Sequence, residues 1–143
     1  MLLSASSKTE IELQRKLAGI DYFIAGGYVV TPDNYSDIDV FFYTETDYLQ
    51  ARKRLGKPDF STEHADTYHD SSDIIQLINS RFGSPYDITS SFDLHNCCKA
   101  LLPDGQVYTH PDYNDKISVN TDNLNSATIK RLFKLSEIGR AHV

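Results

Sequence analysis

The stretch Phe23–Tyr43, FIAGGYVVTPDNYSDIDVFFY, decides the predicted fold. It begins with an apolar run that ends at a pair of glycines, and it finishes with a second apolar run that opens on Asp37 and Asp39. Successive side chains of an extended strand point to opposite faces, so both carboxylates share one face while Ile38 and Val40 share the other. Neighbouring carboxylates repel each other, and oxygen donors at this spacing suit divalent metal ions held beside a triphosphate.

Each half of this stretch has an ordinary explanation, since glycine pairs are common in turns and Asp-x-Asp is common on solvated strands. Together they give a strand, a Gly-Gly turn, a short loop and an alternation of apolar and acidic residues. This order resembles the signature of the nucleotidyltransferase superfamily, which includes polymerase beta, tRNA nucleotidyltransferases and small stand-alone transferases, some of them phage-encoded. The resemblance covers about residues 20–110.

The resemblance implies a set of catalytic, metal-binding carboxylates. Asp37 and Asp39 would hold the metal ion bound to the triphosphate, while a third carboxylate would hold a second ion and orient the acceptor hydroxyl. Asp93 has an apolar neighbour on each side, as expected of the third carboxylate. Asp87 stays open as the alternative, although its neighbours make its setting loop-like. The implied cofactor is Mg²⁺ or Mn²⁺.

The same resemblance implies residues that bind the nucleotide. At Gly26 and Gly27 the missing side chains would let backbone N–H groups approach the phosphates. Ser36 would either bind phosphate or cap the following strand. Lys99 shares a face with the third carboxylate if residues 92–101 form one strand, and it would then meet a phosphate. A solvated lysine is the other interpretation.

The periodicity of the chain predicts an α/β (α+β) fold in a single domain over residues 1–143, with a mixed sheet covered by helices on one face. Residues 60–69 are ambiguous, and residues 84–91 read as a turn or one helical turn. The predicted strands are 22–25, 38–43, 73–80, 92–101 and 106–109, and the predicted helices are 8–17, 46–55 and a closing helix at about 123–138.

Composition limits the possible partners. The chain has 143 residues, of which 40% are hydrophobic and 24% charged, as in globular proteins. Its formal net charge of −6 argues against an extended DNA surface, because polyanions are held by many basic contacts. No apolar run approaches the roughly 20 residues that span a bilayer, and the N-terminus lacks a secretory pattern, so we expect no membrane contact and a cytoplasmic location.

The cysteines and histidines give no metal-binding pattern. Cys97 and Cys98 are adjacent, and they are predicted to be small buried residues of a strand. His64, His69 and His110 lack the spacing of metal ligands and are mostly expected at the surface.

The leading functional hypothesis is an enzyme, a metal-dependent nucleotidyltransferase. It would bind ATP or another nucleoside triphosphate, transfer the nucleoside monophosphate to a hydroxyl of an RNA end, a protein or a small molecule, and release pyrophosphate. A departure from the family is Tyr28-Val29-Val30, where tRNA nucleotidyltransferases often carry Arg-Asp. The alternative is a catalytically retired nucleotide- or protein-binding module on the same scaffold. A metal-dependent nuclease is a third possibility.

Overall fold

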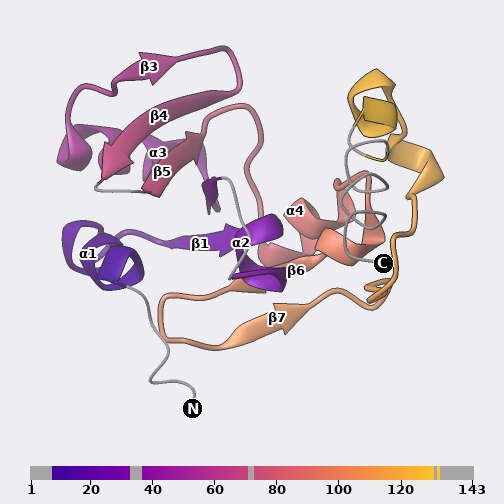
Figure 1. Cartoon of the computed structure of the whole chain (residues 1–143). Coiled ribbons are helices and arrows are strands. Elements are labelled where there is room, and N and C mark those ends of the chain that lie inside the picture. Colours follow the sequence, from indigo (N-terminus) through magenta and orange to yellow (C-terminus); the bar gives the residue numbers. More distant parts are fainter. Residues whose placement is uncertain (1–7, 33–36, 71–72, 131, 133–143) are drawn as a thin grey trace.

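The computed structural model describes residues 8–32, 37–70, 73–130 and 132, which form a mixed seven-stranded sheet (Figure 1). The strand order is β3-β4-β5-β2-β1-β6-β7. The central β2 pairs in parallel with β5 and antiparallel with β1, and the remaining pairs are antiparallel. The strands are β1 Tyr22–Ala25, β2 Ile38–Phe42, β3 Phe60–Ser61, β4 Ala65–Asp70, β5 Asp73–Ile78, β6 Lys99–Leu101 and β7 Val107–Thr109. The predicted mixed α/β fold is confirmed.

The two longer helices lie where the sequence predicts them. Thr44 begins the second of them, because its side chain accepts a hydrogen bond from the backbone N–H of Asp47. Gly56 ends the same helix with φ +82°, and its N–H donates to the carbonyl of Arg52. The helices are α1 Lys8–Lys16, α2 Gly27–Val30, α3 Glu45–Leu55 and α4 Pro85–Ser90, with 3-10 turns at His95–Cys97 and Thr121–Asn123.

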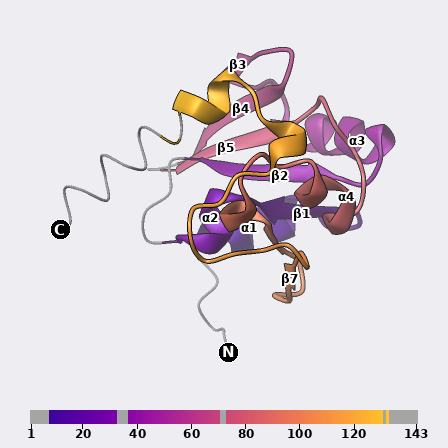
Figure 2. The same cartoon turned by 90° about the vertical axis from the view of Figure 1, so that its right-hand side faces the viewer.

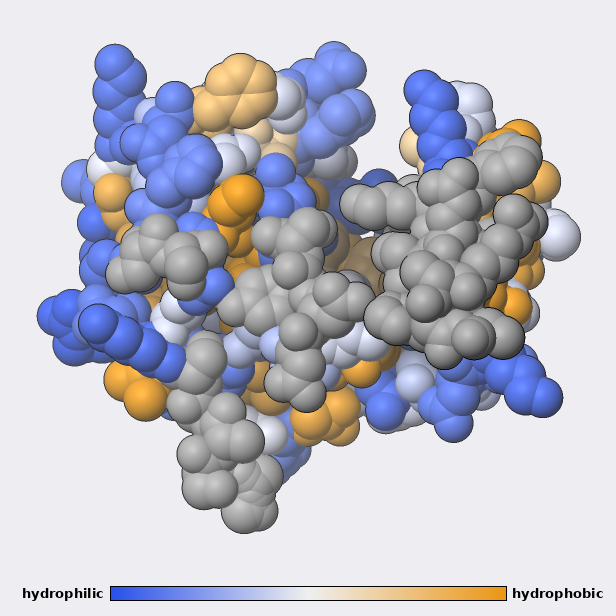
Figure 3. Space-filling view, in the orientation of Figure 1, coloured by the Kyte–Doolittle hydropathy of each residue, from blue (hydrophilic) through white to orange (hydrophobic). Residues whose placement is uncertain are grey.

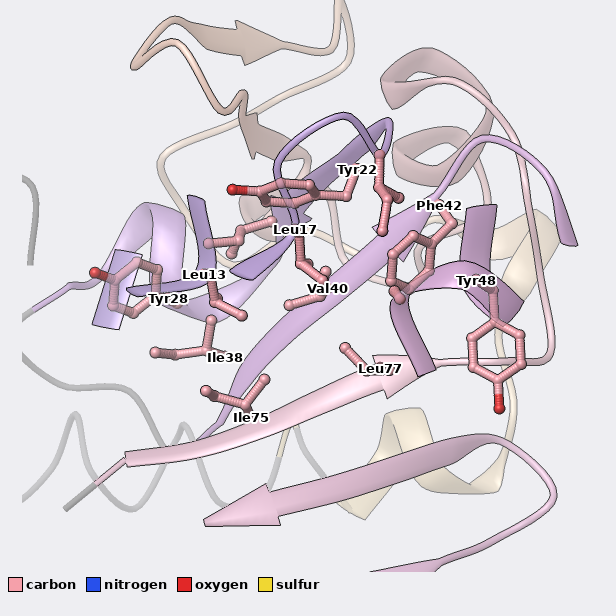
Figure 4. Close-up of a cluster of buried hydrophobic side chains, with 13 residues drawn as sticks. Leu13, Leu17, Tyr22, Tyr28, Ile38, Val40, Phe42, Tyr48, Ile75 and Leu77 are labelled. Carbon is pink, nitrogen blue, oxygen red and sulfur yellow. The ribbon is translucent and has the colours of Figure 1, made fainter. Parts of the chain in front are cut away.

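One face of the sheet, which we call the closed face, is covered by α1 and α3 (Figure 4). From α1, Leu13 and Leu17 pack onto it, and they are almost fully buried. From α3, Tyr48 and Ala51 do the same. The strand residues of this core are Tyr22, Ile24, Ile38, Val40, Phe42, Ile75 and Leu77.

The opposite face, which we call the open face, has a smaller core. Phe23 and Ala25 of β1 point there, because they alternate with the residues of the closed face. Phe41 of β2 and Ala100 of β6 join them, and α4 adds Ile88. Partly buried Ile78, Phe92, Leu102 and Tyr108 pack against this core.

The predicted strand 92–101 is wrong in its first part. Only Lys99–Leu101 pairs with a neighbouring strand, and His95–Cys97 forms a 3-10 turn. The carbonyls of Ser90 and Phe92 accept hydrogen bonds from distant asparagine side chains, so this backbone makes its bonds outside the sheet.

Two further expectations need correction at the ends of elements. The Gly26-Gly27 turn leads directly into a helical turn, because Gly27 is already the first residue of α2. The closing helix expected at about 123–138 begins at residue 126; residues 131 and 133–138 lie outside the described part of the chain. Among the residues that the structure describes, no helix has the length and apolar character needed to cross a bilayer.

Candidate functional site: an acidic pocket on the open face

A pocket of about 500 Å³ opens beside β2, and five predicted site residues line it. Such a volume is typical of sites for small ligands. Figure 3 shows the molecule hollowed between the β3–β5 side and the segment that reaches residue 130. The predicted residues that line it are Gly26, Gly27, Asp37, Asp39 and Asp93.

The alternation of β2 places the first two carboxylates. Ile38 and Val40 are fully buried on the closed face, whereas Asp37 and Asp39 are half-buried on the open face and line the pocket. Asp39 lies opposite Gln76 of β5 in the parallel pair, so it occupies the centre of the sheet. The predicted sharing of one face by the two carboxylates is confirmed.

Asp93 reaches the pocket from a loop rather than from a strand. The loop follows α4, and two contacts from the C-terminal part hold it. The hydroxyl of Thr128 donates to Oδ2 of Asp93 at 2.6 Å, and the backbone N–H of Asn120 donates to its carbonyl at 2.8 Å. The carboxylate is therefore positioned by residues that follow it in the chain by about thirty positions.

Residues 118–130, which we call the wall segment, contribute Asn123, Asn125 and Ala127 to the lining of the pocket. Figure 2 shows the backbone of this segment in orange to yellow. The side-chain amide of Asn123 donates to the carbonyls of Ser90 and Phe92 at 3.0 and 3.2 Å. Asn125 accepts from the backbone N–H of Thr128 at 3.1 Å and so caps the helical turn 126–130. Asn123 and Asn125 both line the pocket, which makes the wall segment part of the site.

The glycine pair forms another part of the lining. Gly26 has φ +96° and ψ −145°, a backbone conformation that glycine adopts readily and other residues rarely. Its N–H donates to the carbonyl of Lys99 at 3.2 Å, which joins the turn to β6. A Cβ atom at Gly26 or Gly27 would have no heavy atom within 4 Å, so the space beside both residues is open.

An aromatic wall lies next to the carboxylates. Phe41 and Phe92 both line the pocket, and their ring centroids lie 5.9 Å apart at an interplanar angle of 52°. The rings of Phe23 and Phe41 are stacked with their centroids 5.9 Å apart, which holds the Phe41 ring in place. The pocket thus combines anionic oxygen atoms with apolar surface.

The rim carries two basic side chains, Arg81, which was not predicted as a site residue, and His64, which was expected only at the surface. Arg81 is exposed, lines the pocket, and donates from Nη1 to the hydroxyl of Ser91 at 2.7 Å. His64 lines the other side of the rim and is also exposed. No local pattern marks either residue, because β5 and the β3–β4 turn bring them to the pocket only in the folded chain.

Two of the residues considered from the sequence lie elsewhere, and a third falls outside the described residues. Lys99 does not line the pocket, and its ammonium group lies over the ring of Tyr113, 4.4 Å from the centroid. Asp87 belongs to a capping box with Ser84 at the start of α4, so it is engaged in holding the helix. Ser36 lies outside the described residues.

The described residues do not show a preformed cage for the implied metal ions. Within residues 8–32, 37–70, 73–130 and 132, no group of three or more His, Cys, Asp or Glu side chains is placed to hold a metal ion. A divalent ion needs several oxygen atoms about one point at roughly 2.0–2.6 Å. The three carboxylates share a pocket without being grouped in this way among the described residues, and the binding of Mg²⁺ or Mn²⁺ there stays a prediction.

The adjacent cysteines differ in their surroundings. Cys98 is buried, its thiol donates to the carbonyl of Thr89 at 3.3 Å, and burial raises its pKa to about 11. Cys97 is partly exposed and lines the pocket, which corrects its expected burial in a strand.

His110 is the exception among the histidines expected at the surface, because only 7% of it is exposed. The backbone N–H of Asp112 donates to Nδ1 at 2.9 Å, so the neutral ring carries its proton on Nε2. Nε2 lies 2.9 Å from the hydroxyl of Ser90, and the ring stacks on Tyr86 of α4. His110, which follows β7, therefore links the end of that strand to α4.

Comparison with known proteins changes the functional interpretation. No curated protein matches this chain. Residues 3–118 match a family model described as Gad2, Gabija anti-defense 2 family protein. This family is distinct from the nucleotidyltransferases, so the superfamily assignment, the transferase reaction and the expected binding of ATP or another nucleotide are corrected. The matched region contains the whole sheet and all three pocket carboxylates, and the chain belongs to the Gabija anti-defense 2 family.

Proposed function

We propose that this protein counteracts a Gabija defence system by binding one of the proteins of that system. Membership of the Gabija anti-defense 2 family over residues 3–118 carries the proposal. Two features of the molecule support a binding role. The pocket on the open face is concave and combines polar with aromatic lining, and the net charge of −6 suits contact with a basic protein surface.

A plaque assay tests the proposal directly. Cells that carry a Gabija system are infected with phage, with and without expression of this protein. Plaque counts should rise toward those on cells without the system. Cells that lack Gabija are the control, and there the protein should leave plaque counts unchanged. Unchanged plaque counts on the Gabija cells, with the protein present at normal levels, would contradict the proposal.

A binding mode of action also predicts a stable complex. Each Gabija protein is produced with an affinity tag together with this chain, and the purified complex is analysed by size-exclusion chromatography with light scattering. We expect co-elution in a fixed ratio with one of them. Relief of defence without any complex would point to action by turnover and would count against the binding mechanism.

A further inference from the structure

The two edges of the sheet differ in how they are protected from pairing with another strand. The strand order places β3 at one edge and β7 at the other (Figure 1). β3 has only two residues, and Pro58 and Asp59 stand directly before it. Short length, proline and charge are common means of blocking an edge. Residues 106–109, which contain β7, include neither a charged residue nor a proline.

The hydrogen bonds of β7 show which of its backbone groups face outward. In an antiparallel pair, only every second residue bonds the neighbouring strand. The carbonyl of Gln106 accepts from the N–H of Leu102 at 2.8 Å, and the N–H of His110 donates toward the same side at 3.0 Å. The N–H and C=O groups of Val107 and Thr109 therefore point away from β6. Within the described residues, these four groups have no hydrogen-bond partner.

The residues next to β7 limit this outer edge. The N–H of Gly105 donates to the carbonyl of Leu102 at 2.9 Å, so it turns back toward β6. Pro111 has no N–H and cannot extend a ladder. The outer edge thus offers two N–H and two C=O groups. An extended segment presents backbone groups in the matching pattern, whereas a helix uses its own backbone groups internally.

Apolar surface lies beside the outer edge. Val107 is 53% exposed and lies directly opposite Leu101 of β6. Leu101 and the exposed Ile11 of α1 line one small hollow. Side chains of an added strand alternate between the two faces, so one of them would pack beside Val107. An apolar residue suits that position.

The charges at the two ends of β7 select the partner. Asp104 and Asp112 flank the strand, and both are exposed. In a two-fold pair of β7 strands centred on Tyr108, Asp104 of each copy would face Asp112 of the other, and like charges placed opposite each other are unfavourable. A strand of three residues also buries far less than the roughly 1,200 Å² of a stable interface. The outer edge therefore suits a segment of a larger protein with basic flanks rather than a second copy of this chain.

We propose that β7 binds an extended segment of the Gabija protein on which this chain acts, and that the segment becomes an eighth strand of the sheet. The inference rests on the proposed function and names the surface and the kind of partner. The segment forms main-chain hydrogen bonds with Val107 and Thr109. It places an apolar side chain beside Val107, and it carries Lys or Arg at its flanks, next to Asp104 and Asp112.

A proline substitution tests the outer edge while sparing the sheet. Val107→Pro removes an N–H that points away from β6, and edge strands tolerate proline at such positions. Affinity for the Gabija protein found by co-elution is measured by calorimetry. Val107→Pro should bind at least about tenfold more weakly, because a carbonyl of the bound segment loses its donor. Val107→Ile keeps the N–H and the branched apolar shape, so it should bind like the wild type. Urea denaturation confirms that both variants are folded.

Hydrogen exchange of the wild type gives an independent measurement. In the free protein, the amides of Val107 and Thr109 should exchange much faster than that of Tyr108, whose N–H faces β6. Binding of the Gabija protein should slow the exchange of Val107 and Thr109. Mass spectrometry with electron-transfer fragmentation resolves the single residues. Unchanged exchange at both residues in the complex would overturn the inference.

A charge variant tests the flanks. Asp104→Asn/Asp112→Asn should bind about two- to tenfold more weakly at low salt, and its binding should depend less on salt. Glu45→Gln/Glu63→Gln removes the same charge from exposed positions on α3 and on the β3–β4 turn, and it should bind like the wild type. Equal weakening by the two variants would indicate an effect of net charge and would contradict the basic flanks.

The outcomes separate this inference from the proposed function. If folded Val107→Pro binds the Gabija protein and relieves defence as the wild type does, the outer edge is not the contact, while the proposed function holds. If the wild type is a dimer that Val107→Pro converts into a monomer, the edge belongs to a second copy and the inference is wrong. If the wild type neither binds a Gabija protein nor relieves defence, the proposed function fails, and the inference that rests on it fails with it.

Discussion

The two faces of the sheet are built from the same strands and yet have opposite characters. On β2, Ile38, Val40 and Phe42 are fully buried beneath α1 and α3, while the residues between them reach the open face. There Asp37 and Asp39 line a pocket. Because successive side chains of a strand point to opposite faces, the same strand contributes apolar residues to the core and carboxylates to the pocket.

The comparison predicts that truncating a side chain lowers the free energy of unfolding more on the closed face than on the open face. Phe42→Ala should lower the free energy of unfolding by about 3–5 kcal/mol, since it leaves a cavity under α3. Phe41→Ala should cost less, because water can enter the truncated site from the pocket. Urea denaturation followed by circular dichroism measures both. An equal or larger loss for Phe41→Ala would break the comparison.

A backbone substitution at the pocket should have the next largest effect. Gly26→Ala places a side chain at φ +96° and ψ −145°, so we expect a loss of about 1–3 kcal/mol. Gly27→Ala is the control, because the space beside it is equally open but Gly27 does not have a positive φ. It should change the midpoint of urea unfolding very little. Similar losses for the two variants would show that the positive φ of Gly26 is not what makes its substitution costly.

The closed face should also weaken at alkaline pH. Burial raises the pKa of Tyr22 to about 12, above its ordinary value near 10. The folded state thus keeps a proton that the unfolded state loses, so this contribution is complete below pH 10 and disappears as the pH rises toward 12. Tyr22→Phe should reduce the alkaline loss of stability by about 1–2 kcal/mol. Urea midpoints at pH 8, 10 and 11.5 measure it, and parallel curves for the two proteins would refute the assignment.

The smallest effect is expected for the charges of the open face. Asp37→Asn/Asp39→Asn keeps the shape of both side chains and removes two negative charges that repel each other. The free energy of unfolding should change by less than about 1 kcal/mol. Thermal unfolding at low and high salt measures it. A large loss would mean that the carboxylates hold the fold together rather than serve the pocket.

The sequence predicts the part of the fold that local signals determine. Strand β1, strand β2 and α3 follow from apolar periodicity and from the caps at Thr44 and Gly56. The shared face of Asp37 and Asp39 follows from the period of two alone.

The remaining parts depend on contacts between distant segments. Residues 92–98 look like a strand because apolar residues dominate them. The backbone carbonyls near their start instead accept hydrogen bonds from the side-chain amides of Asn120 and Asn123, about thirty residues later in the chain. Arg81 joins the rim only because β5 ends beside the pocket. No local pattern contains such information.

Function was the least predictable part. The glycine pair and the three carboxylates do meet at one pocket, as the resemblance implies. The same placement of residues is compatible with more than one chemistry, and the family match assigns the chain to a group defined by counter-defence. A correct prediction of geometry therefore did not give a correct prediction of activity.

The attachment of the wall segment has a consequence for engineering. The side-chain amide of Asn123 and the hydroxyl of Thr128 donate hydrogen bonds to Ser90 and Asp93. None of the residues of the wall segment belongs to a strand of the sheet. Grafting a different sequence between residues 121 and 127, with Asn123 and Asn125 kept, would reshape the mouth of the cavity and leave the strands of the sheet unchanged. The shape of the pocket mouth can thus be changed separately from the sheet.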